Sequence, residues 1–270
     1  MKNKSAVFGF IIIILFIFIA IFGEFIVPHN PVEINLFNNY QSPSREHWLG
    51  TDNLGRDIFS RMLFGARYSL QISIVGVAIG VFIGLFLGVI GGYFGGWLDS
   101  IVVSIIDVLL SFPGILLAIF IVAIFGKGIF NTMLAVAIFS VPSFARIIRS
   151  SILFSKEMEY IEAVRALGAN DLRIIMKHII PNSLSPIIVQ STLMLGRAIL
   201  IAAGLSFLGL GVQPPNPEWG AMLSEARSYL RSSPIGSIAP GVAITLVVLS
   251  FSLVGDGIRD VLDPKLKNLN

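Results

Sequence analysis

The residues that could carry out chemistry are few in this sequence and lie far apart. The histidines are His29, His47 and His178, and no two of them have the short spacing of paired metal ligands. The chain contains no cysteine, so it offers no thiolate nucleophile, disulfide or cysteine-ligated metal. We therefore expect no metal centre and no catalytic residues.

A nucleotide-binding motif is also missing. The P-loop pattern G-x-x-x-x-G-K-[ST] needs Ser or Thr after its lysine, because this hydroxyl and the loop hold Mg²⁺ and the phosphates. The Gly–Lys pair of this chain is Gly126–Lys127, and Gly128 follows it. We therefore expect that the chain binds no nucleotide through a P-loop of its own.

Two aspartates in apolar surroundings, Asp107 and Asp256, suggest an enzymatic alternative. Intramembrane aspartyl proteases resemble one another in a G-x-G-D motif. The stretch here is Leu253-Val254-Gly255-Asp256, which lacks the leading glycine. A non-transport membrane enzyme or scaffold is thus the alternative of a different class.

Asp107 and Arg197 are ionisable residues within apolar stretches. A charge at the centre of a transmembrane helix costs about 2.5–3.5 kcal/mol on insertion scales, so such residues usually face a cavity or a partner. Both are candidates for a translocation path, and the alternatives are snorkelling or a structural ion pair. We also expect Pro113 to kink the helix that contains Asp107.

A charged segment interrupts the apolar chain and has the signals of a helical hairpin over residues 155–181. Ser155 is expected to cap its first helix, and Gly168 to end that helix in the left-handed conformation. Asn170 is expected to cap the second helix, and Pro181 to separate it from the next apolar span. We interpret this hairpin as a docking element for a soluble partner.

The rest of the chain is typical of a membrane protein. Of its 270 residues, 55% are hydrophobic and 13% charged, against about 25% charged in soluble domains. A bilayer core about 30 Å thick requires about 20 apolar residues per helix. Six stretches are long enough, at about 6–27, 69–92, 99–125, 129–152, 184–211 and 237–258. The sequence thus predicts an all-α integral membrane protein with six transmembrane helices.

Lys and Arg favour the cytoplasmic segments of membrane proteins, and their distribution here predicts that both termini and the hairpin are cytoplasmic. The first span is longer than the apolar part of a signal peptide and lacks an A-x-A site, so we interpret it as an uncleaved anchor. The predicted divisions are an anchor helix (1–27), an extracytoplasmic loop (28–67), a core (68–258) with an extracytoplasmic helix (213–235), and a cytoplasmic tail (259–270).

Glycines recur every four residues in the second span, at Gly76, Gly80, Gly84 and Gly88, and the spacing continues to Gly96. On a helix they form one face without side chains, against which another helix can pack closely. Packing within the chain and packing against another subunit remain open alternatives.

The hairpin also carries a resemblance to a known family. Its stretch EAVRALG, followed by Ile180-Pro181, resembles the cytoplasmic loop of ABC-importer permeases. Three other stretches, HWLGTDNLGRDIFSRMLFGARYSLQIS, GLSFLGLGVQPPNPEWGAML and GDGIRDVLDPKL, resemble the dipeptide/oligopeptide/nickel branch of that family. Within that branch, the chain resembles the subunit with a short outer loop, permease C. The similarity covers nearly the whole chain.

The resemblance implies the type I ABC-importer permease fold in the cell membrane. The implied partners are a homologous second permease subunit, two ABC ATPase subunits that use ATP–Mg, and an extracytoplasmic solute-binding protein. Surrounding lipid is also expected, and nucleic acid is not. The chain would be a non-catalytic subunit that forms half of the translocation pathway. Without a His, Cys or Met cluster we favour small peptides as the substrate, with nickel or a metal chelate as the alternative.

In this resemblance the hairpin couples the permease to an ATPase. Apolar contacts are implied for four of its residues, polar contacts for two and the turn for its glycine. In chain order these residues are Ile161, Glu162, Ala163, Val164, Arg165, Leu167 and Gly168.

Overall fold

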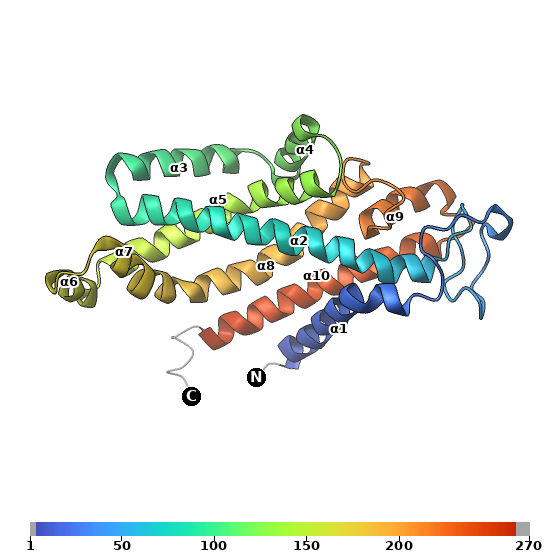
Figure 1. Cartoon of the computed structure of the whole chain (residues 1–270), viewed down its shortest axis with the longest axis horizontal. Coiled ribbons are helices and arrows are strands. Elements are labelled where there is room, and N and C mark those ends of the chain that lie inside the picture. The colour runs from blue at the N-terminus through green and yellow to red at the C-terminus, as the bar shows by residue number, and fades with distance from the viewer. Residues whose placement is uncertain (1–3, 263–270) are drawn as a thin grey trace.

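The computed structural model describes residues 4–262, and the predicted tail lies largely outside them. The described chain is a bundle of helices (Figure 1). They are α1 (Lys4–Ile26), α2 (Ile58–Val89), α3 (Gly96–Ser111), α4 (Gly114–Phe125), α5 (Ile129–Lys156), α6 (Glu159–Ala166), α7 (Asp171–Ile174), α8 (Ile180–Phe207), α9 (Trp219–Ala226) and α10 (Ile235–Leu262). Short 3₁₀ turns are η1 (Leu36–Asn38) and η4 (Arg227–Tyr229), and π turns are η2 (Ile90–Phe94) and η3 (Ile175–Ile179).

Five helical segments of the described chain are long and apolar enough to cross a membrane, and the bent pair α3–α4 can make a sixth. This confirms the all-α, multi-span prediction. The region 99–125 is broken rather than kinked, because α3 and α4 meet at 96°. Pro113 has no N–H to continue the helix, and Phe112 before it is extended, with φ −87° and ψ 134°.

The second span begins earlier than the sequence predicted, at Ile58, within the range expected to be loop. Asp57 caps α2, because its carboxylate accepts a hydrogen bond from the backbone N–H of Ser60. Charged residues made this turn look like loop in the sequence. One of them, Arg61, is only 1% exposed, because it is paired within the protein.

The glycine face of α2 packs against α5. An added Cβ would lie 2.5 to 3.0 Å from a side-chain carbon of α5 at each position, a distance too short for two carbons. The pairs are Gly76–Val136, Gly80–Ser140, Gly84–Phe144, Gly88–Ile148 and Gly92–Ile152. These contacts support the first of the two alternatives, because the glycine face packs against another helix of the same chain. Gly96 does not continue the series, because it begins α3 with φ +59° and open space around it.

The remaining helices surround this pair. Helix α8 packs on both α2 and α5, α10 packs on α8, and α1 packs along α10. Helices α3 and α4 lie on the side of α2 and α5 that is opposite α10 and α1 (Figure 1). The hairpin helices α6 and α7 form one end of the long axis, and α9 with the loop before α2 forms the other. The start of α1 and the end of α10 are directed toward the hairpin end.

Two local predictions about the hairpin were wrong. Ser155 lies in the last turn of α5, and α6 is preceded instead by Met158, whose side chain makes no cap. Pro181 does not separate the second helix from the span, since residues 171–207 form one helical segment. The π turn η3 accompanies this continuity: the N–H of Ile180 bonds to the carbonyl of Ile175, five residues back, and Pro181 follows directly at the start of α8.

Candidate coupling hairpin and outer loop

The turn of the hairpin has the backbone that the sequence predicts. Gly168 has φ +82°, the left-handed conformation that glycine adopts without a steric penalty. Its N–H donates to the carbonyl of Arg165. The side chain of Asn170 accepts a hydrogen bond from the N–H of Arg173 and caps α7. The hairpin is therefore a defined turn between two short helices.

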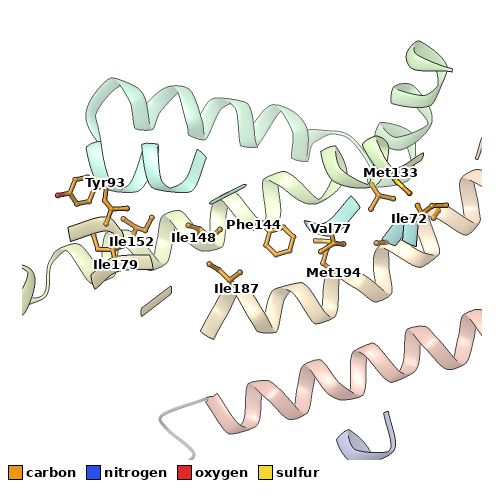
Figure 2. Close-up of a cluster of buried hydrophobic side chains, with 14 of the residues drawn as sticks. Ile72, Val77, Tyr93, Met133, Phe144, Ile148, Ile152, Ile179, Ile187 and Met194 are labelled. Carbon is orange, nitrogen blue, oxygen red and sulfur yellow. The ribbon is translucent and has the colours of Figure 1, made fainter. Parts of the chain in front are cut away.

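The inner face of the hairpin is part of the main hydrophobic core. Ile161 is 1% exposed, and it belongs to one buried cluster with Ile174, Ile179, Ile152 and Tyr93. Figure 2 shows Tyr93, Ile152 and Ile179 at one end of this cluster. The ends of α2, α5 and α8 thus meet the hairpin through buried side chains. The resemblance implied a partner contact for Ile161, but the structure buries this side chain inside the protein.

Polar contacts tie the same region together. The hydroxyl of Tyr93 donates to Asp171 at 2.5 Å, and Lys156 Nζ donates to the Tyr93 carbonyl at 2.9 Å. Arg165 Nη2 donates to the Tyr93 hydroxyl at 3.4 Å. The π turn η2 that follows α2 is therefore bonded to α5, α6 and α7. These contacts attach the hairpin to the bundle as one unit.

The outward residues of the hairpin include several large apolar side chains. Leu167 is 87% exposed, Leu172 is 69% exposed and Met176 is 57% exposed. Four residues near Leu167 in the sequence are also exposed: Glu162, Ala163, Arg165 and Gly168. Val164, by contrast, is half-buried against the core. Sequence reasoning missed Leu172 and Met176, although their spacing of four in a charged segment was a signal of one helix face.

The two candidates for the translocation path have different environments. Arg146 donates to Asp107 at 3.0 Å, and both side chains are 60% exposed. This contact is the structural ion pair that was one alternative for Asp107. Arg197 is exposed on α8 and has no hydrogen-bond or ion-pair partner among residues 4–262. Asp256 lies on α10, which Figure 1 places across the bundle from the α3 helix of Asp107.

The opposite end of the molecule holds a buried group of charges that sequence reasoning missed. Arg56 donates to Asp52 at 2.7 Å and to Glu225 at 2.6 Å. Arg61 donates to the same Glu225 oxygen at 2.9 Å. The arginine side chains are 4% and 2% exposed. These bonds connect the loop before α2, and α2 itself, to α9.

Helix α9 packs its apolar face into the bundle. Trp219 is fully buried, and its indole N–H donates to the carbonyl of Met62 at 3.1 Å. The carboxylate of Glu218 caps α9 and accepts from Ser69. Burial raises the pKa of Glu218 above its usual range. The apolar face of α9 is therefore occupied by the protein itself.

The loop before α2 also brings together histidines that are distant in sequence. The rings of His29 and His47 have centroids 4.7 Å apart, and His47 Nδ1 lies 2.9 Å from an Asp57 oxygen. Their sequence spacing indicated no metal site. Because the loop folds back on the start of α2, the two histidine rings lie close together although they are distant in the sequence.

Comparison with known proteins identifies the family. Residues 80–268 match the family of binding-protein-dependent transport system inner membrane components. The chain belongs to this family. The first 43 residues of the permease match the N-terminal transmembrane domain of oligopeptide transport permease C. This confirms the resemblance found in the sequence, and it makes the chain a non-catalytic, multi-pass subunit of the cytoplasmic membrane.

The permease is similar in sequence to named transport permeases. It is 51% identical over 267 residues to the dipeptide transport system permease protein DppC of Alkalihalophilus pseudofirmus, covering 99% of this chain and 88% of the relative. It is 50% identical over 271 residues to the glutathione transport system permease protein GsiD of Pectobacterium atrosepticum, covering 99% and 89%.

Solved structures share the fold of the permease. The inward-facing MetNI methionine ABC transporter matches with a TM-score of 0.64 and 20% identity, over 76% of this chain and 98% of that one. An amino acid ABC transporter with histidines matches with a TM-score of 0.58 and 20% identity, over 76% and 95%. Together with the helical bundle, these matches confirm the ABC-importer permease fold.

Proposed function

We propose that this permease forms half of the translocation pathway of an ATP-driven importer of small peptides. Both relatives at about half identity carry peptide cargo in their names, a dipeptide in one case and glutathione, itself a tripeptide, in the other. Neither name refers to a metal, so peptides are favoured over nickel or a metal chelate. The cargo assignment rests on this shared naming.

The proposed assembly contains a second, homologous permease, two ATPases that hold ATP–Mg, and a solute-binding protein. The family description, which names a binding-protein-dependent system, supports the last of these. In this proposal the hairpin end is cytoplasmic and the end with the loop before α2 is extracytoplasmic. The positive-inside bias of the sequence supports that orientation.

The hairpin is the proposed contact for an ATPase, and one observation carries this assignment. Large apolar side chains, Leu167 and Leu172, are exposed on a charged segment beyond the apolar spans, while the root of the same hairpin is packed and hydrogen-bonded to the bundle. Exposed apolar side chains are what a partner's groove can bury. A rigid root is what transmits movement from that groove to the spans. Coupling then requires that the two states of the transporter hold the hairpin differently.

The decisive experiment exchanges one exposed apolar residue for a charge. We expect Leu172→Asp to leave insertion and folding intact, because the side chain is 69% exposed, and to weaken ATPase binding by about tenfold or more, as loss of a buried apolar anchor does at interfaces. The measurement is co-purification of the ATPase with the permease and transport-coupled ATP hydrolysis in liposomes.

The matched control is Leu230→Asp, at the other end of the molecule, where the side chain is 51% exposed. It should leave ATPase co-purification unchanged. A second variant, Gly168→Val, changes the turn without removing an apolar contact, since a β-branched residue at φ +82° is strained by about 1–2 kcal/mol. Normal ATPase binding and coupled hydrolysis in both Leu172→Asp and Gly168→Val would show that the ATPase docks elsewhere.

Arg197 is the proposed path residue. It is an exposed cation on α8 without an intramolecular partner among the described residues, and a charge in an apolar span requires a polar surrounding. A water-filled path between two permease subunits provides one. Asp107 is a weaker candidate, because Arg146 already pairs with it.

A further inference from the structure

We propose that the loop before α2 holds a binding site for a divalent transition-metal ion. The site consists of His29, His47 and Asp57; each offers one possible ligand atom, and these three atoms lie within 4.8 Å of one another. Imidazole nitrogen is the ligand type that suits Zn²⁺, Ni²⁺ and Cu²⁺, and a carboxylate adds the negative charge that favours a cation. This inference does not depend on which cargo the transporter carries.

Two ring nitrogens in the cluster are buried without a hydrogen-bond partner, His29 Nδ1 and His47 Nε2. His47 as a whole is only 5% exposed. Buried polar atoms of folded proteins nearly always have a partner, so an unpartnered pair on adjacent rings calls for an explanation. A metal bound by both nitrogens would satisfy the two atoms at once.

Asp57 gives His47 the tautomer that a metal ligand needs. Its Oδ1 lies 2.9 Å from His47 Nδ1, so that nitrogen carries the proton and donates it, and Nε2 keeps its lone pair. A histidine that ligates a metal usually donates its other N–H to a carboxylate or carbonyl in this way. Asp57 Oδ2 lies 3.9 Å from His29 Nδ1. Ligands of tetrahedral zinc, at about 2.0–2.2 Å from the metal, are about 3.3–3.6 Å apart, so the carboxylate is near enough to approach the ion after a small movement.

The surroundings suit a hydrated cation. The three residues border a cavity of about 180 Å³, which Glu33 and Glu46 also line. No lysine or arginine lines this cavity. Its volume leaves room for water ligands beside the metal, since one water occupies about 30 Å³. The carboxylates increase the attraction for a cation and can accept hydrogen bonds from its waters.

A metal at the proposed site would cross-link the long irregular loop between α1 and α2. Its ligands come from the segment after α1, from the middle of the loop and from the cap of α2. The loop from α1 to α2 has only the short turn η1 as regular helix. Connections of this length with little regular structure are uncommon unless functional or held by other contacts. A metal at this point would join three parts of the loop and limit its movement against α2.

The experiment measures metal binding to the purified full-length chain, prepared with a tag free of histidine and treated with a chelator. Zn²⁺ titration by calorimetry gives the stoichiometry, and the absorption spectrum of added Co²⁺ reports coordination by nitrogen ligands. We expect one Zn²⁺ per chain. His29→Gln and His47→Gln should each weaken binding by about tenfold or more, the size of effect typical of altered metal sites.

His178→Gln is the matched control, because it removes the third histidine of the chain, at the hairpin end of the molecule. It should bind Zn²⁺ like the unaltered chain. His29→Gln is the safer variant for folding, because the side chain of His29 is 35% exposed against 7% for His47, and the substitution keeps the hydrogen bond from its backbone N–H to Ser60 Oγ. The Co²⁺ spectrum of the unaltered chain needs no variant at all. Absence of a stoichiometric site, or binding that survives both His29→Gln and His47→Gln, overturns the proposal.

Discussion

Gly84→Ala tests whether the close approach of α2 and α5 holds the bundle together. A Cβ at this position would lie 2.5 Å from the Cβ of Phe144, 3.0 Å from the backbone nitrogen of Ala145 and 3.2 Å from the carbonyl of Val141. None of these atoms is the end of a flexible side chain. The added methyl group can therefore be accommodated only if the two helices move apart or the backbone bends.

The size of the effect follows from the distances. Carbon atoms in contact are about 3.5–4.0 Å apart, so the helices must separate locally by about 1 Å. Inserting a methyl group into a well-packed core costs about 1–3 kcal/mol. Alanine has a better helix propensity than glycine by about 1 kcal/mol, which offsets part of that cost. We expect a net destabilisation of about 0–2 kcal/mol.

Gly241→Ala is the matched control, because Gly241 lies in α10 and an added Cβ there has no atom within 4 Å. Both variants gain the same propensity, so their difference isolates the steric contact. Thermal unfolding of the purified chain in one detergent should separate the midpoints by about 2–12 °C, at about 2–4 °C per kcal/mol. If Gly84→Ala unfolds at the same temperature as Gly241→Ala or above it, the inferred steric role of this glycine is wrong.

Two further predictions concern charged residues. Arg197→Ala should reduce peptide uptake by about 10- to 150-fold, since removal of a charged contact to cargo costs about 1.5–3 kcal/mol, while ATPase co-purification stays unchanged. Uptake equal to that of the unaltered transporter would contradict its place in the path. Glu225→Ala should destabilise the fold by about 2–3 kcal/mol, because Arg56 and Arg61 are buried and lose a shared acceptor. This is somewhat less than the loss of about 3–5 kcal/mol for a fully buried pair, because Glu225 is 22% exposed. Its control, Glu24→Ala, removes only the exposed pair with Arg67, which is worth about 0–1 kcal/mol. If both variants lowered the free energy of unfolding equally, the structural importance inferred for Glu225 would be refuted.

The backbone of the membrane spans could be predicted from the sequence because each span satisfies its own hydrogen bonds. A run of about 20 apolar residues must form a helix in a bilayer, whatever its neighbours are. The turn at Gly168 was predictable for a similar reason, since a left-handed residue is a local requirement. Helix boundaries were less certain. Ile58 begins α2 within an expected loop, because the charges that suggested a loop are paired with distant residues.

The faces of the helices could not be predicted in this way. A spacing of four showed that the glycines of α2 share one face, but packing within the chain and packing against another subunit remained open alternatives. The residues of α6 were known, but the burial of Ile161 depends on α5, α7 and the end of α2. Pro181 was expected to end a helix, but the helical segment continues past it after a π turn.

The sequence by itself determined that this protein is a helical membrane permease with a charged hairpin and no P-loop, because hydropathy, turn residues and short motifs act within a few positions of the chain. The tertiary structure decided which side chains meet. It paired Gly84 with Phe144, Arg61 with Glu225 and His29 with His47. Such pairs join segments that are distant in the chain, so they depend on how the helices pack together, and no local pattern specifies them.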